Sequence, residues 1–70
     1  METIAVGDLY QDQITDCCAE VVHIDYDKKR VSYKFFSPDR LDTVTDSIVL
    51  FCMSFKQVSK EDVIKWKLKT

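Results

Sequence analysis

The 70-residue chain has a mass of 8.2 kDa, which fits a single domain over residues 1–70. It is 46% hydrophobic and 11% aromatic and contains one Gly and one Pro, which excludes a disordered tail or a low-complexity linker. The net charge of −2 and the isoelectric point near 5.2 are unlike the strongly basic balance typical of nucleic-acid-binding domains. A chain of this size builds only a small core, which leaves little room for a deep catalytic pocket.

The first half of the chain predicts a short strand followed by a hairpin. The first strand begins at Leu9-Tyr10, directly after a turn signal. Cys17–Tyr26 is rich in β-branched and aromatic residues, as strands are. Residues 27–29 are short and polar, and Arg30–Phe36 then places apolar residues at alternate positions. These two runs therefore predict a β-hairpin.

The middle of the second half predicts one long apolar strand. We expect residues 37–42 to form a loop, because Pro38 disfavours both a helix and a central strand. Thr43–Phe55 is rich in Thr, Val, Ile and Phe, which favours a strand over a helix. Both faces of such a strand are apolar over residues 48–55, whereas a small sheet buries only one face. Either residues 59–65 fold back over the second face, or a homodimer or partner covers it, or the segment is instead a helix buried on several sides.

The end of the chain predicts a brief helical turn and then a closing strand. Ser59 with Asp62 three residues later is typical of a helix start. Lys65–Lys69 alternates strictly between charged and apolar residues, which predicts a strand with Trp66 and Leu68 facing inward.

Four segments carry a resemblance to a known fold family: Gly7-Asp8-Leu9-Tyr10, Val22-His23-Ile24-Asp25, Val31-Ser32-Tyr33 and the late turn before Trp66. In these segments the chain resembles SH3-like β-barrels of the Tudor and KOW kind. The resemblance implies a mainly β fold, a small five-stranded SH3-like barrel with one short helical turn near the C-terminus, and a binding module rather than an enzyme. The chain lacks the Gly-rich basic turn of KOW domains. It is also similar to small viral and phage accessory proteins, which implies a phage-type accessory role.

Cysteine usage and apolar runs bear on localisation and cofactors. The odd set Cys17, Cys18 and Cys52, together with a start that lacks the pattern of a signal peptide, predicts reduced thiols in a cytoplasm, that of the host if the protein is viral. No paired cysteine spacing points to a metal site, so we expect no metal and no cofactor. The longest apolar run, Ile48–Met53, is far shorter than the roughly 18 residues of a membrane helix, so we expect no membrane partner.

Charge is distributed unevenly along the chain. Residues 1–27 hold seven acidic residues and no Lys or Arg, and residues 28–70 hold ten basic and five acidic residues, so the two parts carry −7 and +5. This asymmetry predicts either two oppositely charged surfaces or acids that lie beside bases on neighbouring antiparallel strands.

These observations lead to an expected function and two sets of candidate residues. We expect a non-catalytic protein–protein interaction module, a phage-encoded modulator or inhibitor of a host protein that acts through an acidic and aromatic surface. We expect its partner to be a basic or DNA-binding protein, with homodimerisation as a further expectation. Its predicted contact residues are Tyr10, Asp25, Tyr26, Asp27, Phe36, Phe51, Met53 and Phe55. The alternative is a nucleic-acid-binding barrel that uses Lys65, Trp66, Lys67 and Lys69.

The aromatic and acidic residues also bear on two other functions, methyl-lysine binding and catalysis. An aromatic cage for a methylated lysine would use Tyr10, Tyr26, Tyr33, Phe35 and Phe36, but we expect these rings to pack in the core. The chain has no nucleophile elbow, phosphate loop or HExxH motif, and Asp25 with Asp27 is too small a carboxylate set for a nuclease. We therefore expect no catalysis.

Overall fold

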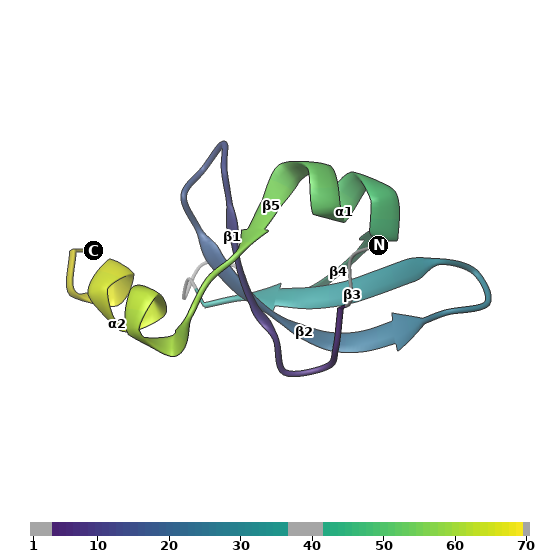
Figure 1. Ribbon diagram of the computed structural model, residues 1–70, viewed down its shortest axis with the longest axis horizontal. Coiled ribbons are helices and arrows are strands. Elements are labelled where there is room, and N and C mark those ends of the chain that lie inside the picture. Colours follow the sequence, from purple (N-terminus) through teal and green to yellow (C-terminus); the bar gives the residue numbers. More distant parts are fainter. Residues whose placement is uncertain (1–3, 37–41, 70) are drawn as a thin grey trace.

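The computed structural model describes residues 4–36 and 42–69. Within these ranges the chain forms five strands and two helices (Figure 1), which confirms the predicted mainly β fold. In chain order the elements are β1 (Leu9–Asp12), β2 (Cys18–Asp25), β3 (Arg30–Phe35), β4 (Thr43–Ser47), α1 (Ile48–Ser54), β5 (Phe55–Gln57) and α2 (Lys60–Lys69).

The strands form one antiparallel sheet in the order β4-β3-β2-β1-β5. β2, β3 and β4 follow one another as a meander, and β5 returns to pair with β1 after α1 has crossed one face of the sheet (Figure 1). Among the described residues β4 and β5 are the two edges, and the sheet is not closed into a barrel. The five strands are thus confirmed, and the SH3-like barrel stays a prediction.

The predicted β2–β3 hairpin is confirmed. Ala19 lies opposite Phe35 and Asp25 lies opposite Arg30, with a register shift between Val21 and His23. The turn is built without glycine, because Lys29 adopts a positive φ of 55°. An extra residue in one strand increases the local twist, so the shift bends the sheet at this point.

One face of the sheet carries the core. Tyr10, Val21 and Tyr33 are buried on this face, and Phe51 of α1 and Phe55 of β5 close over them. The rings of Phe51 and Phe55 are stacked with centroids 4.5 Å apart, and Tyr10 meets Phe51 at 4.8 Å. Stacked and edge-to-face contacts at these distances add to the burial of apolar area. The expectation that the aromatic residues pack in the core is confirmed for Tyr10 and Tyr33, and Phe35 packs against the core cluster, but the expectation is wrong for Tyr26, which is 69% exposed.

The predicted single strand over Thr43–Phe55 is wrong, because its centre forms α1. Ser47 caps the helix, with its Oγ accepting a hydrogen bond from the backbone N–H of Leu50 at 3.1 Å. A helix also places Ile48, Phe51 and Cys52 on one face toward the core. The helix alternative holds, but α1 is buried on one side only, and its other side is exposed.

The predicted closing strand over Lys65–Lys69 is also wrong, because these residues continue α2. The predicted helix start is confirmed: the Ser59 backbone N–H donates to Asp62, and the Asp62 N–H donates to Ser59 Oγ. Lys and Leu favour a helix more than a strand, and no Gly or Pro stops α2. Trp66 is half-buried, whereas Leu68 is 82% exposed and does not face inward.

The two helices occupy different faces of the sheet. α1 packs on the core face between β4 and β5. α2 is held by Val63, which is buried beside Leu9 and Glu20. Because Leu9 and Glu20 alternate with the core-facing Tyr10 and Ala19, Val63 attaches α2 to the side of the sheet opposite to α1. In the described part of the chain neither helix is long and apolar enough to cross a bilayer.

Candidate functional site

The predicted contact residues do not form one surface. Tyr10, Phe51 and Phe55 are core residues, each 6% exposed or less, so their side chains face no partner in this structure. The strand face that would have joined Phe51 to Met53 does not exist, because both residues belong to α1. Met53 points the other way and is 73% exposed.

The acidic and aromatic residues of the β2–β3 turn are also separated from the other predicted contact residues. Asp25 accepts a hydrogen bond from the Lys28 backbone N–H at 3.1 Å, which fixes the turn. Tyr26 is exposed, and its hydroxyl donates to the carbonyl of Ile4. Phe36 lies at the far end of β3, where the Lys67 Nζ stands 4.6 Å from its ring centroid. Asp25, Tyr26 and Asp27 therefore share no site with Phe36.

Several acids of the first 27 residues serve the fold itself. Asp8 accepts from the Ala5 N–H and Asp12 accepts from the Ile14 N–H, each at 2.9 Å. The register also places Glu20 opposite Lys34 on neighbouring strands. Opposite charges at directly facing positions stabilise an antiparallel pair. Glu20 and Asp25 thus lie opposite bases on the neighbouring strand, whereas Asp8 and Asp12 bind backbone N–H groups.

An exposed apolar surface lies on the outer side of α1. Val49, Leu50 and Met53 are 65%, 59% and 73% exposed. The exposed Ile14 follows Gln13, whose N–H donates to the Ser54 carbonyl at the end of the helix. We call Val49, Leu50, Met53 and Ile14 the α1 face. Of these four residues, sequence reasoning found only Met53, and it placed that residue on a strand.

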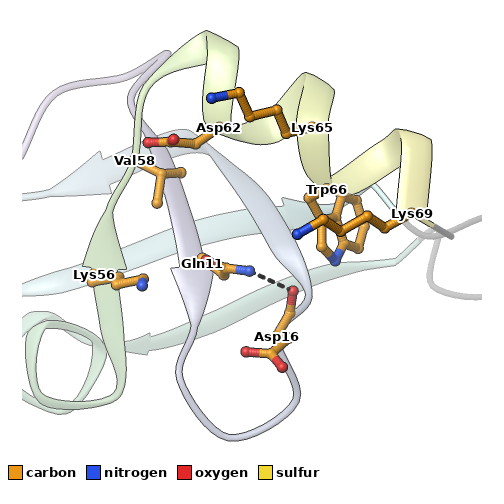
Figure 2. Close-up of a pocket in the computed structure, with 8 residues that line it drawn as sticks. All are labelled: Gln11, Asp16, Lys56, Val58, Asp62, Lys65, Trp66 and Lys69. Atoms are coloured by element: carbon orange, nitrogen blue, oxygen red, sulfur yellow. Dashed lines mark hydrogen bonds between the residues drawn. The ribbon is translucent and has the colours of Figure 1, made fainter.

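A groove opens between α2 and the sheet. Its volume is about 420 Å³, and Figure 2 shows its lining, which is Gln11, Asp16, Lys56, Val58, Asp62, Lys65, Trp66 and Lys69. We call it the α2 groove. Three of the four residues predicted for nucleic acid, Lys65, Trp66 and Lys69, thus line one cavity. The fourth, Lys67, lies over Phe36 instead.

Hydrogen bonds fix part of the groove lining. The Gln11 side-chain amide donates to the Asp16 carbonyl at 3.0 Å (Figure 2). Bonds from the Ser59 backbone and hydroxyl lower the pKa of Asp62, and Lys65 and Lys56 lower it further. Asp62 is therefore ionised at neutral pH and engaged in capping α2. Lys56 and Gln11 were missed by sequence reasoning, since β5 and β1 meet α2 only in the folded chain.

A second, more apolar pocket of about 320 Å³ lies on the other flank of α2. Its lining is Gly7, Leu9, Glu20, Phe36, Lys60, Val63, Ile64 and Lys67. Both flanks of α2 thus border a pocket, and Val63 is the buried residue of this helix.

Two titratable groups are perturbed in the interior. Burial, together with a hydrogen bond to Asp46, raises the pKa of Tyr33. Burial also raises the pKa of the Cys18 thiol, and the neighbouring Cys17 adds to the effect. The three cysteines are free thiols, and no group of three or more His, Cys, Asp or Glu side chains that could hold a metal ion occurs in residues 4–36 and 42–69.

Comparison of the chain with protein-family models, with curated proteins and with solved structures found no match.

Proposed function

We propose that the chain is a non-catalytic protein–protein interaction module whose contact surface is the α1 face. The observation that carries the proposal is the exposure of three large apolar side chains, Val49, Leu50 and Met53, on one side of one helix. Each contributes on the order of 1.5–3 kcal/mol when it is fully buried. Exposed apolar side chains that adjoin one another are typical of contact sites, whereas single ones are common on any surface.

The occupant that fits this face best is a second copy of the chain. α1 carries no charged residue, so two copies can meet around a twofold axis without bringing like charges together. The face is small compared with the roughly 800 Å² per partner of a standard interface. We therefore expect a weak dimer with a Kd on the order of 0.1–1 mM.

The strand arrangement supports the SH3-like barrel as part of the same proposal. A meander of β2, β3 and β4 is followed by a helix and by β5, which returns to β1. The register shift in β2 favours the strong bend that such a small barrel requires. SH3-like barrels serve many functions, so the fold alone does not identify the partner.

Sedimentation velocity across a dilution series tests the proposed interface. Wild-type protein should show a rising weight-average mass between about 20 μM and about 2 mM, the range that brackets the expected Kd. The double variant Leu50→Glu/Met53→Lys keeps the net charge and should stay monomeric.

The matched control is Ile64→Glu/Leu68→Lys, which introduces the same two residue types on the exposed side of α2. It should associate as the wild type does. A wild type that stays monomeric at the highest concentration, or an α1 variant that associates as tightly as the control, would contradict the proposal.

A further inference from the structure

We infer that the α2 groove binds single-stranded nucleic acid, with a base stacked on Trp66 and the backbone phosphates held by Lys56, Lys65 and Lys69. Gln11 and Lys56 of this groove alternate along their strands with the buried Tyr10 and Phe55, so the groove opens on the face of the sheet opposite to the one that carries α1. The two surfaces can therefore be tested and can fail independently.

The three cations of the groove come from two elements: Lys69 lies beside the Trp66 indole, and Lys65 and Lys56 line the groove farther from it (Figure 2). Lys65 and Lys69 are four residues apart, so they lie on the same side of α2, and Lys56 faces them from β5 (Figure 2). Trp66 lies between the two helix lysines in sequence and is half-buried. Lysine ammonium groups beside an aromatic ring are the combination that binds phosphates and stacks a base in single-strand sites.

The carboxylates of the groove distinguish it from a purely cationic surface. Asp62 is engaged with Ser59 as the cap of α2. Asp16 stands in a turn with a positive φ of 62° and also lines the groove. With three ammonium groups against two carboxylates, the groove offers few phosphate contacts, and its carboxylates can accept hydrogen bonds from base amino groups.

The number of cations and the indole favour a single strand over a duplex. A duplex keeps its bases stacked inside, where the half-buried Trp66 cannot reach their faces, and duplex-binding surfaces carry more positive charge. An acidic peptide would engage the lysines but has no planar base for the indole. A single strand is therefore the ligand that can contact both the lysines and the Trp66 indole.

Trp66 is the only tryptophan of the chain, so its fluorescence reports on the groove directly. We expect a short oligothymidylate to quench this emission, and the anisotropy of the labelled oligonucleotide to rise over the same concentration range. Three phosphate contacts predict that log K falls with log salt with a slope of about −2. Trp66→Leu should weaken binding about 5- to 150-fold, the range expected for the loss of one stacked base.

Two lysine double variants with equal charge separate the groove from general electrostatics. Lys65→Gln/Lys69→Gln removes two groove cations and should weaken binding at low salt at least tenfold more than Lys28→Gln/Lys60→Gln does. Lys28 and Lys60 are exposed and do not line the α2 groove. Circular dichroism of each variant checks that the fold is retained.

Four results would overturn the inference. They are equal affinities of the two lysine variants, anisotropy changes without quenching of Trp66, a matched DNA duplex that binds as tightly as the single strand, and polyglutamate that binds as tightly as the oligonucleotide. The last result would identify the groove as a site for acidic peptides. Because the wild-type quenching needs no substitution, the test holds even if Trp66→Leu fails to fold.

Discussion

The two helices of this small protein differ in almost every physical respect. α1 has seven residues, none of them charged, and it lies between two strands with Phe51 inserted into the core. α2 has ten residues, six of them charged, and Val63 is its buried residue. α1 is therefore part of the core, and its remaining apolar side chains are exposed. α2 is attached at the periphery of the sheet, and its charged side chains line pockets. The comparison shows that burial fixes the position of a helix and that the remaining side chains decide what its surface can bind.

The largest expected difference between the helices is in the unfolding free energy that is lost when the buried residue of each helix is truncated. Phe51→Ala removes a ring that is 1% exposed and contacts three other aromatic rings, and should cost about 3–5 kcal/mol of unfolding free energy. Val63→Ala should cost only about 1.5 kcal/mol, since it removes two carbons from a site at the edge of the fold. Urea titrations followed by circular dichroism measure both values. Similar losses for the two variants would show that α2 is as much a part of the core as α1.

The hydrogen bond from Tyr33 to Asp46 links β3 to β4 beneath α1. It also makes the free energy of unfolding sensitive to pH in the alkaline range. Tyr33 has a raised pKa in the folded state, whereas its hydroxyl ionises near pH 10 in the unfolded chain. Above about pH 10 the unfolded state therefore binds fewer protons than the folded state, so stability falls as the pH rises.

Tyr33→Phe should lower the unfolding free energy at pH 7 by about 1.5–3 kcal/mol, because the bond to a carboxylate is lost. It should also flatten the decline in stability between about pH 9 and pH 11, and the raised pKa of Cys18 should contribute to the decline that remains. Urea midpoints across this pH range provide the measurement. An identical pH profile in the wild type and the variant would mean that Tyr33 ionises equally in both states.

Replacing the capping serine of either helix by alanine should have the smallest effect on stability, and we expect this effect to differ between α1 and α2. Ser47→Ala removes the cap of α1 and should lower the global stability by about 1 kcal/mol. Ser59→Ala removes the cap of α2 and should mainly speed amide exchange within that helix, because α2 can open while the sheet stays folded. Hydrogen exchange would contradict this difference if Ser59→Ala accelerated exchange equally throughout the sheet.

The parts of the fold that were predicted correctly have a clear local pattern. β3 alternates between more and less buried residues, β2 is rich in β-branched residues, and the cap of Ser59 with Asp62 lies within four residues. α1 was predicted as part of a strand, with a helix only as an alternative, because an uninterrupted apolar run has no periodicity that distinguishes the two; the signal that identifies the helix is Ser47, at the start of the run. The strict alternation of Lys65–Lys69 was misleading, since five residues are too few to distinguish a strand from the end of a helix.

The candidate surfaces were only partly predictable for the same reason. Lys65, Trp66 and Lys69 come together because a helix brings residues i, i+1 and i+4 to one side, and the same geometry separates Lys67 from them. Lys56 joins them only through the pairing of β5 with β1, which no local pattern reveals. The α1 face depends on knowing that the segment is helical and that Phe51 is the side chain it buries.

Amide resonances recorded through a dilution series, and then with added oligothymidylate, test the separation of the two surfaces most directly. We predict that dilution shifts the resonances of Ile14, Val49, Leu50 and Met53, and that the oligonucleotide shifts those of Gln11, Lys56, Lys65, Trp66 and Lys69. The two sets should not overlap. A common set of shifted resonances, or no shift at the α1 face in either titration, would contradict the account.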